Sequence, residues 1–347
     1  MIITLKKGIN PNEIQSLTKE FEKHKCNCKV IDIDNLSKIM VINGETKSID
    51  DHNILSNPMI DKVMRISTPY KLVSREYKPN DTIIKVGDVA IGGNDIIVIA
   101  GPCSVEGHDQ IDRIAKIVKE SGAHILRGGA YKPRKSPYYF QGLKEEGIKY
   151  LVEAKNKYHM PIITEITSLD NISQYDDVDI IQVGARNMQN YELLKGLGKI
   201  NKPILLKRGM ANTIEELLLS AEYIATNGNP NIILCERGIR TIETATRNTL
   251  DLSSVSLLKK LTHLPVICDP SHATGNWELV EPMSLASICS GADGLIIEVH
   301  DDPKNALSDG DQSIKVERLK GILEKGKKIS NVLGRDIKWE LKSPHLI

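Results

Sequence analysis

Apolar and polar positions in the first 66 residues follow two different periods. Strand-like apolar runs occupy residues 2–6, 28–33, 38–42 and 60–66. Apolar residues at helical spacing follow Pro11, with Ile14, Leu17 and Phe21 on one face, and a shorter helical piece covers residues 49–55. The resulting order, βαββαβ, predicts a small ferredoxin-like α+β domain over residues 1–66.

From residue 95 onward, strand-like runs alternate with helical patterns, which is typical of parallel βα units. The strand-like runs are residues 95–100, 124–127, 161–164, 180–183, 203–206, 232–235, 265–268 and 294–298. Eight such runs predict an α/β fold, a (β/α)₈ TIM barrel over residues 83–338. Residues 83–91 predict a hairpin that closes the bottom of the barrel. Residues 67–82 are polar, contain two prolines and are interpreted as a linker between the domains.

The composition excludes several classes of partner. The 46 basic and 45 acidic residues nearly balance, so no electrostatic attraction to nucleic acid or to a membrane is expected. No apolar run reaches the roughly 18 residues that a membrane span needs, and the first residues lack the apolar core of a signal peptide. The six cysteines show no framework spacing. We therefore expect free thiols and a cytoplasmic protein.

One loop after the second barrel strand concentrates positive charge. Residues 127–142, RGGAYKPRKSPYYFQG, include Arg127, Lys132, Arg134 and Lys135. A basic loop is most often a solvated surface loop, but this one begins where α/β barrels place their active sites. The guanidinium group of arginine, with a lysine nearby, can donate paired hydrogen bonds to a phosphate or a carboxylate. The context therefore favours an anion cradle for a phosphorylated substrate.

Other strand ends carry cations too, and the strand ends of a barrel converge on one face. The cations near this face are Arg127, Lys132, Arg134, Arg186, Lys207, Arg208 and Arg237. A single arginine there has a simple structural explanation, an ion pair with a carboxylate. A set drawn from four strand ends predicts bound anions instead, either two anionic groups or one phosphate with a carboxylate.

A second set at the same face consists of Cys103, His272, Glu298 and Asp309. Taken singly, each has a structural explanation: Cys103 as a small core side chain, His272 as a hydrogen-bonded core histidine, and Asp309 as a turn residue before Gly310. Together they resemble the mixed sulfur, nitrogen and oxygen donors of a divalent metal site for Mn²⁺, Fe²⁺, Co²⁺ or Zn²⁺. The four residues are scattered along the chain, so their spacing alone only suggests a metal site.

Seven blocks of the sequence carry a resemblance to a known family. In chain order they are AGPCSVE, LRGGAYKPRKSPY, QVGARNMQNYELLK, PILLKRGM, CERGIRT, CDPSHATG and IIEVH followed by SDGDQS. Over residues 68–335 the chain resembles the 3-deoxy-D-arabino-heptulosonate 7-phosphate (DAHP) synthases of type Iβ. The resemblance implies condensation of phosphoenolpyruvate with erythrose 4-phosphate, the first step of the shikimate pathway.

The resemblance also implies roles for the candidate residues. Cys103, His272, Glu298 and Asp309 would hold the divalent metal ion. Arg127, Lys132, Arg186, Lys207 and Arg237 would bind phosphoenolpyruvate, and Arg134 and Ser136 would contact the phosphate of erythrose 4-phosphate. Lys132, Cys103 and His272 would be the catalytic residues, with the proton donor either Lys132 or a water molecule on the metal.

The N-terminal module resembles the regulatory domain of some family members. This implies feedback by an aromatic amino acid, tyrosine or phenylalanine, and the family implies a homotetramer. Three positions depart from the family pattern: Lys135 replaces a threonine, Asp301 replaces a proline, and Asp311 adds a carboxylate that we expect to face solvent.

Two other functions remain open. The 3-deoxy-manno-octulosonate 8-phosphate synthases share the barrel and use arabinose 5-phosphate; they carry asparagine in a KANRSS-like segment where this chain has Pro133. A non-catalytic binder of aromatic metabolites is the second alternative. An inactive scaffold, however, would have no physical reason to hold a complete set of metal-type ligands and cations.

Overall fold

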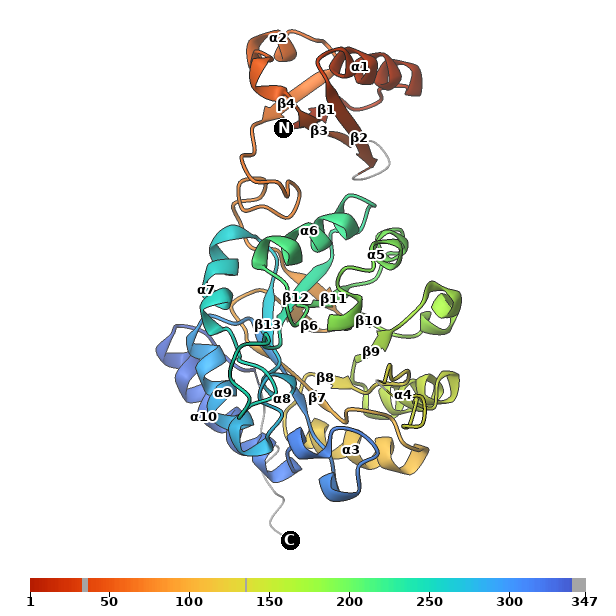
Figure 1. Ribbon diagram of the computed structural model, residues 1–347, viewed down its shortest axis with the longest axis vertical. Coiled ribbons are helices and arrows are strands. Elements are labelled where there is room, and N and C mark those ends of the chain that lie inside the picture. The colour runs from red at the N-terminus through yellow and green to blue at the C-terminus, as the bar shows by residue number, and fades with distance from the viewer. Residues whose placement is uncertain (33–36, 135, 339–347) are drawn as a thin grey trace.

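The computed structural model describes residues 1–32, 37–134 and 136–338. The N-terminal domain is a four-stranded antiparallel sheet with two helices, and it forms a separate lobe beyond the barrel (Figure 1). Its elements are β1 (Ile2–Leu5), α1 (Pro11–Lys23), β2 (Cys26–Asp32), β3 (Lys38–Gly44), α2 (Asp51–Leu55) and β4 (Ile60–Met64). The strand order β2-β3-β1-β4 confirms the predicted ferredoxin-like domain. The end of the predicted strand 28–33 and its turn lie outside the described residues.

Alternation along β1 gives this sheet two apolar faces. Ile3 packs with Leu17 and Phe21 of α1, which begins at a capping box between Asn10 and Glu13. Ile2 belongs to the opposite face, which joins the large core that continues through Tyr70 into the barrel. The domain is therefore connected to the barrel by packed apolar side chains.

The segment interpreted as a linker is itself fixed to the barrel. The backbone N–H groups of Leu72 and Val73 donate to the carboxylate of Glu222 at 3.0 and 3.1 Å. The hydroxyl of Thr262 donates to the carbonyl of Val73, and Val73 is buried. This segment is thus an ordered junction that lies against two barrel helices.

Eight parallel strands close into a barrel in the order β7 to β14, as predicted. The strands are β7 (Ile97–Gly101), β8 (Ile125–Arg127), β9 (Ile162–Ile166), β10 (Ile180–Val183), β11 (Ile204–Lys207), β12 (Ile232–Glu236), β13 (Val266–Cys268) and β14 (Gly294–Glu298). The helices around them are α3 (His108–Glu120), α4 (Glu145–Tyr158), α5 (Tyr191–Leu197), α6 (Ile214–Ala225), α7 (Leu252–Leu261), α8 (Pro270–Thr274), α9 (Trp277–Cys289) and α10 (Val316–Val332). Short 3₁₀ helices are η1 (Thr46–Ser48), η2 (Leu169–Tyr175), η3 (Ala185–Asn187), η4 (Pro303–Asn305) and η5 (Gly310–Gln312).

A hairpin of β5 (Ile84–Val86) and β6 (Val89–Ile91) closes the N-terminal end of the barrel. Its buried Ile84, Val86 and Ile91 pack with inward-facing strand residues such as Ile99 and Ile296. The barrel interior is therefore filled with apolar side chains at this end, and polar chemistry is confined to the opposite end. No helix in the described part of the chain is long and apolar enough to cross a membrane.

Candidate active site

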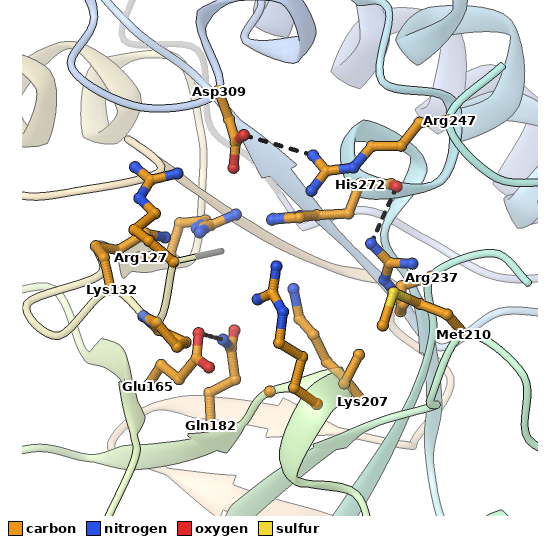
Figure 2. A pocket seen from close by; sticks show the side chains of 15 residues that line it. Arg127, Lys132, Glu165, Gln182, Lys207, Met210, Arg237, Arg247, His272 and Asp309 are labelled. Carbon is orange, nitrogen blue, oxygen red and sulfur yellow. Dashed lines mark hydrogen bonds and ion pairs between the residues drawn. The ribbon is translucent and has the colours of Figure 1, made fainter. Parts of the chain in front are cut away.

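Figure 2 shows the cavity at the C-terminal end of the barrel, where side chains from many strand ends point toward one another. Arg127 is the last residue of β8, Lys207 the last of β11, and Arg237 follows β12. Lys132 and Arg134 come from the loop after β8, and Arg186 lies in η3. All six side chains line this cavity. The predicted cations therefore converge, and we call Arg127, Lys132, Arg186, Lys207 and Arg237 the cation cradle.

The second predicted set also converges. We call Cys103, His272, Glu298 and Asp309 the ligand set. One donor atom from each side chain lies within 4.8 Å of the others. Cys103 follows β7, His272 lies in α8, Glu298 ends β14, and Asp309 lies in the loop beyond β14. Asp309 adopts a left-handed backbone conformation with φ 51°, which is uncommon for a residue other than glycine.

The chemistry of the ligand set fits a divalent transition metal ion. Oε1 of Glu298 is buried and has no hydrogen-bond partner among the described residues, an arrangement that is costly unless another group is bound. The Cys103 thiol donates to Oδ2 of Asp309 at 3.2 Å, and Nε2 of His272 lies 3.4 Å from Oε1 of Glu298. A thiol, an imidazole and two carboxylates aimed at one point match the donors that such ions prefer.

Burial and charge set the protonation of this set. Burial, followed by the nearby Glu298, raises the pKa of Cys103 to about 12, and the positive charge of Lys132 opposes this. Burial also disfavours the charged form of Asp309, but His272, Arg247 and Lys132 outweigh it and lower its pKa to about 2. Burial lowers the pKa of His272, which keeps the imidazole neutral and able to coordinate.

The cation cradle and the ligand set touch at two points. Nζ of Lys132 lies 3.0 Å from Sγ of Cys103, and Nη1 of Arg127 lies 2.9 Å from Oε1 of Glu298. The N–H of Arg127 is not directed at that oxygen, so Nη1 also lacks a hydrogen bond within the described chain. Unsatisfied donors and acceptors therefore meet where the two halves of the site join.

Two glycines make this close approach possible. A Cβ on Gly101, whose φ is 152°, would lie 2.1 Å from the carbonyl oxygen of Arg127. A Cβ on Gly129 would lie 2.8 Å from Cδ of Lys132. Any side chain at either position would displace a cradle residue.

Two cradle cations, Arg186 and Arg237, have no carboxylate partner among the described residues. Within the described residues, Arg237 donates to the carbonyl oxygens of Gly238 and His272 and to no carboxylate, and burial lowers its pKa. Arg186 makes no ion pair with any described residue, and Nη2 of Arg134 is buried without a hydrogen bond in the same part of the chain. Arg237 is buried, and a buried cation without a counter-charge is unfavourable, so this cavity is suited to anionic ligands.

Not every predicted residue joins the site. Arg208 turns away from the cavity because Glu236 and Asp251 each accept from its Nη1 at 2.9 Å, the structural ion-pair explanation. The hydroxyl of Ser136 accepts from the N–H of Tyr138, and Ser136 does not line the cavity. Lys135 lies outside the described residues. Asp311 is exposed, as expected.

The structure adds cavity residues that the sequence patterns did not single out. Glu165 and Gln182 face the cradle and are joined by a hydrogen bond of 3.2 Å. Arg247 lies 3.5 Å from Asp309 and donates to Oε1 of Gln312 at 2.6 Å. Gln312 in turn donates to Oε2 of Glu298 at 2.5 Å. A run of hydrogen bonds thus reaches from the exposed Arg247 to the buried ligand set.

Comparison with known proteins agrees with this geometry. Residues 71–334 match the model of the DAHP synthetase I family, and residues 1–68 match that of the DAHP synthase ferredoxin-like domain. The phospho-2-dehydro-3-deoxyheptonate aldolase of Thermotoga maritima is 49% identical over 96% of this chain and 99% of its own length. The 2-dehydro-3-deoxyphosphooctonate aldolase of Geobacter sulfurreducens is 30% identical over 72% of this chain and 98% of its own.

Solved structures give the same result. The crystal structure of DAHP synthase from Thermotoga maritima is 48% identical, covers 97% of this chain and 99% of its own, and superposes with a TM-score of 0.78. A truncated form of 3-deoxy-D-arabino-heptulosonate 7-phosphate synthase from the same organism is 51% identical and covers 78% of this chain and 99% of its own, with a TM-score of 0.73. By its barrel, its N-terminal domain and its sequence, this chain belongs to the DAHP synthetase I family.

Proposed function

We propose that this chain condenses phosphoenolpyruvate with erythrose 4-phosphate and water, giving 3-deoxy-D-arabino-heptulosonate 7-phosphate and inorganic phosphate. This is the first step of the shikimate pathway, which leads to the aromatic amino acids. The observation that carries the proposal is the contact between the cation cradle and the ligand set, with Arg127 against Glu298 and Lys132 against Cys103. It brings a site for an anionic substrate beside a site that activates a carbonyl group.

The cation cradle supports the binding of phosphoenolpyruvate, which carries a phosphate and a carboxylate. Arg237 and Arg186 offer guanidinium forks that no described carboxylate occupies, and Lys207 contributes a buried ammonium group. Forked donors bind such oxygens at two points and so orient the substrate. The cradle thereby directs C3 of the enol toward the ligand set.

The ligand set would hold a divalent ion: Mn²⁺, Fe²⁺, Co²⁺ or Zn²⁺. When bound, the ion supplies Lewis-acid polarisation of the aldehyde carbonyl. C3 of phosphoenolpyruvate bonds to the aldehyde carbon, and the aldehyde oxygen takes up a proton. Water adds at C2, and the C–O bond to phosphate then breaks, so that phosphate leaves and a ketone remains.

Lys132 is the proposed source of the proton for the aldehyde oxygen. Burial disfavours its charged form, but Cys103, Glu165 and Glu298 outweigh this and raise its pKa, so the ammonium group keeps its proton until an acceptor develops charge. Its Nζ already lies beside the ligand set, 3.0 Å from Sγ of Cys103. Lys132 thus holds a proton at the point where the two substrates would meet.

The loop after β8 supports the shorter aldehyde. Pro133 lines the cavity, fixes its own φ and offers no side-chain donor for additional sugar hydroxyls. Arg134 presents a buried Nη2 without a partner in the described chain, which suits the phosphate of erythrose 4-phosphate. Relatives named as octulosonate enzymes, at about 30% identity, keep arabinose 5-phosphate as the alternative aldehyde.

The first test is the requirement for both substrates. Metal-loaded protein should consume phosphoenolpyruvate and release phosphate only when an aldehyde phosphate is also present. Phosphate release from phosphoenolpyruvate alone would indicate a phosphatase. Binding of aromatic metabolites without any turnover would favour the non-catalytic alternative.

We further propose that the N-terminal domain is regulatory, that tyrosine or phenylalanine is its effector, and that the cytoplasmic enzyme assembles as a homotetramer. The support is the match of residues 1–68 to the ferredoxin-like domain of the same enzymes. The junction that follows this domain is hydrogen-bonded through Leu72 and Val73 to Glu222 of α6, and the loop before α6 carries the cavity residue Met210.

A further inference from the structure

Asp269 is a buried carboxylate that contacts both halves of the site. It follows β13 and caps α8, where its Oδ1 accepts from the backbone N–H of His272 at 2.9 Å. Its Oδ2 lies 2.8 Å from Nδ1 of His272 and 2.5 Å from Nζ of Lys207. The side chain of Asp269 is fully buried. One carboxylate therefore holds a residue of the ligand set and a residue of the cation cradle.

The contact with His272 determines which ring nitrogen can coordinate. An ionised carboxylate only accepts hydrogen bonds, so the proton of the neutral imidazole resides on Nδ1. This leaves the lone pair on Nε2, the nitrogen that faces Glu298 at 3.4 Å within the ligand set. Carboxylate partners of this kind fix both the tautomer and the ring orientation of coordinating histidines.

The contact with Lys207 explains why Asp269 stays ionised. The Nζ of Lys207 at 2.5 Å and the backbone N–H of His272 at 2.9 Å both favour the charged carboxylate over the protonated acid. Lys207 in turn lines the cavity and is itself almost fully buried. Asp269 therefore links His272 and Lys207 in one buried, hydrogen-bonded group.

We propose that Asp269 is a positioning residue that selects the Nδ1–H tautomer of His272 and so prepares Nε2 to bind the metal ion. This rests on the proposed function, since it concerns the same metal site. Asp269 need not touch either substrate. Asp269 affects the reaction indirectly, because it sets the tautomer and the orientation of His272.

The substitution Asp269→Asn tests tautomer selection separately from packing. Asparagine has nearly the same shape as aspartate but carries no charge. If the amide oxygen stays toward the N–H of His272, the amide nitrogen takes the place of Oδ2. It then donates to Nδ1, which moves the proton of the imidazole to Nε2 and blocks coordination. If the amide flips, two donors face each other at the cap of α8. The flipped amide would keep the Nδ1–H tautomer, but this clash of donors at the helix cap disfavours it, so we expect the first arrangement.

Metal affinity is the first measurement. Metal-depleted protein is titrated with Mn²⁺ in equilibrium dialysis, and Asp269→Asn should bind about 10- to 100-fold more weakly than the wild type. The matched control is Asp293→Asn, which replaces another buried carboxylate paired with a lysine, near the opposite end of β14. The control should keep wild-type affinity. Equal affinity of Asp269→Asn and the wild type would overturn the proposal.

A double variant distinguishes tautomer selection from charge balance. Lys207→Met combined with Asp269→Asn removes both partners of the ion pair. The Mn²⁺ affinity should stay weak in the double variant, because the tautomer of His272 is still wrong. Recovery of wild-type affinity would show that Asp269 only neutralises Lys207 and would contradict the proposal.

The tautomer itself can be observed in unaltered protein. Nitrogen-15 NMR of histidine-labelled, metal-depleted wild type, with His272 assigned by comparison with His272→Gln, reports which ring nitrogen carries the proton. We expect Nδ1–H in the wild type and Nε2–H in Asp269→Asn. An Nε2–H tautomer in the wild type would contradict the proposal even if Asp269→Asn fails to fold. No turnover is needed, so this result is independent of the proposed reaction.

Discussion

Nη1 of Arg127 lies 2.9 Å from Oε1 of Glu298, and both side chains are almost completely buried. Arg127 ends β8 and Glu298 ends β14, and β7 lies between these two strands in the barrel. The contact therefore joins a cradle residue to a ligand-set residue across the face of the site. Reaction of an anionic substrate with a metal-activated aldehyde requires this proximity.

Removing the thiol should remove the metal. In Cys103→Ala, the ligand set loses its only sulfur donor, so we expect metal content near zero after dialysis and at least a 100-fold loss of kcat/KM. Treatment of the wild type with a chelator should abolish activity, and added Mn²⁺ should restore it. Metal content is measured by mass spectrometry and activity by phosphate release.

The control for this variant is Cys268→Ala, which removes a buried thiol of β13 that lies outside the ligand set. It should keep its metal and most of its activity. Full activity of metal-free Cys103→Ala would contradict the metal requirement.

Arg237 should contribute mainly to binding of phosphoenolpyruvate. Its guanidinium has no carboxylate partner among the described residues and lines the cavity. Loss of a charged hydrogen bond costs about 1.5–3 kcal/mol, so Arg237→Met should raise KM for phosphoenolpyruvate by about 10- to 100-fold. KM for the aldehyde should change little. Arg240→Met, an exposed position in the same loop, is the control and should match the wild type.

The eight strands and the convergence of the ligand set follow from the sequence, because regular βα repeats place every strand end on one face. The positions of Cys103 and Glu298 next to apolar runs are therefore enough to place both residues at the active-site end of the barrel. Loop conformation is not periodic, and this is why the sequence pattern does not predict Arg247 and Gln312. They reach the site from the loop after β12 and from η5.

The sequence pattern also does not predict the direction in which a side chain points at the end of a strand. Lys207 and Arg208 are adjacent in sequence and equal in charge, yet Lys207 enters the cavity while Arg208 pairs with Glu236 and Asp251. The carboxylates that draw Arg208 away come from β12 and the loop that follows it. Pattern alone carries no information on such partners. The sequence pattern likewise does not predict that Asp269 contacts both His272 and Lys207.

Acid should weaken the junction through His263. Its Nε2 donates to the carbonyl of Leu72, and its Nδ1 accepts from the hydroxyl of Thr82. Burial, with Lys78 and Arg75 adding to it, lowers the pKa of His263 below 6.5. The unfolded chain therefore binds the proton more readily. Stability from the neutral imidazole is present above pH 6.5 and is lost as the pH falls below it.

The measurement is the free energy of unfolding between pH 5 and 8 for the wild type and for His263→Gln. The difference between the two proteins should shrink as the pH falls below 6.5, because glutamine does not titrate. A difference that is constant over this range would contradict a neutral, buried His263.

Deleting the N-terminal domain should separate catalysis from regulation. A protein that begins at residue 69 keeps the junction packed on the barrel, and a truncated relative from Thermotoga maritima has a solved structure. We expect this protein to retain activity and to lose inhibition by tyrosine or phenylalanine. Continued inhibition by the same amino acid would show that the effector binds to the barrel.

A second truncation tests the junction itself. A protein that begins at residue 83 lacks Leu72 and Val73, whose side chains are buried and whose N–H groups donate to Glu222. Burial of an apolar side chain such as these stabilises a protein by roughly 1.5–3 kcal/mol. Its melting temperature should therefore be lower than that of the protein that begins at residue 69. Equal melting temperatures would show that the junction does not stabilise the barrel.

The ratio of kcat/KM for erythrose 4-phosphate to that for arabinose 5-phosphate tests the proposed function most directly. Pro133 at the cavity leaves additional hydroxyls of the longer sugar without a partner, at about 1–3 kcal/mol. Phosphate release with Mn²⁺-loaded protein should therefore favour erythrose 4-phosphate by at least about tenfold, and Pro133→Asn should reduce that ratio. Equal or faster turnover of arabinose 5-phosphate by the wild type would contradict the assignment and identify an octulosonate phosphate synthase.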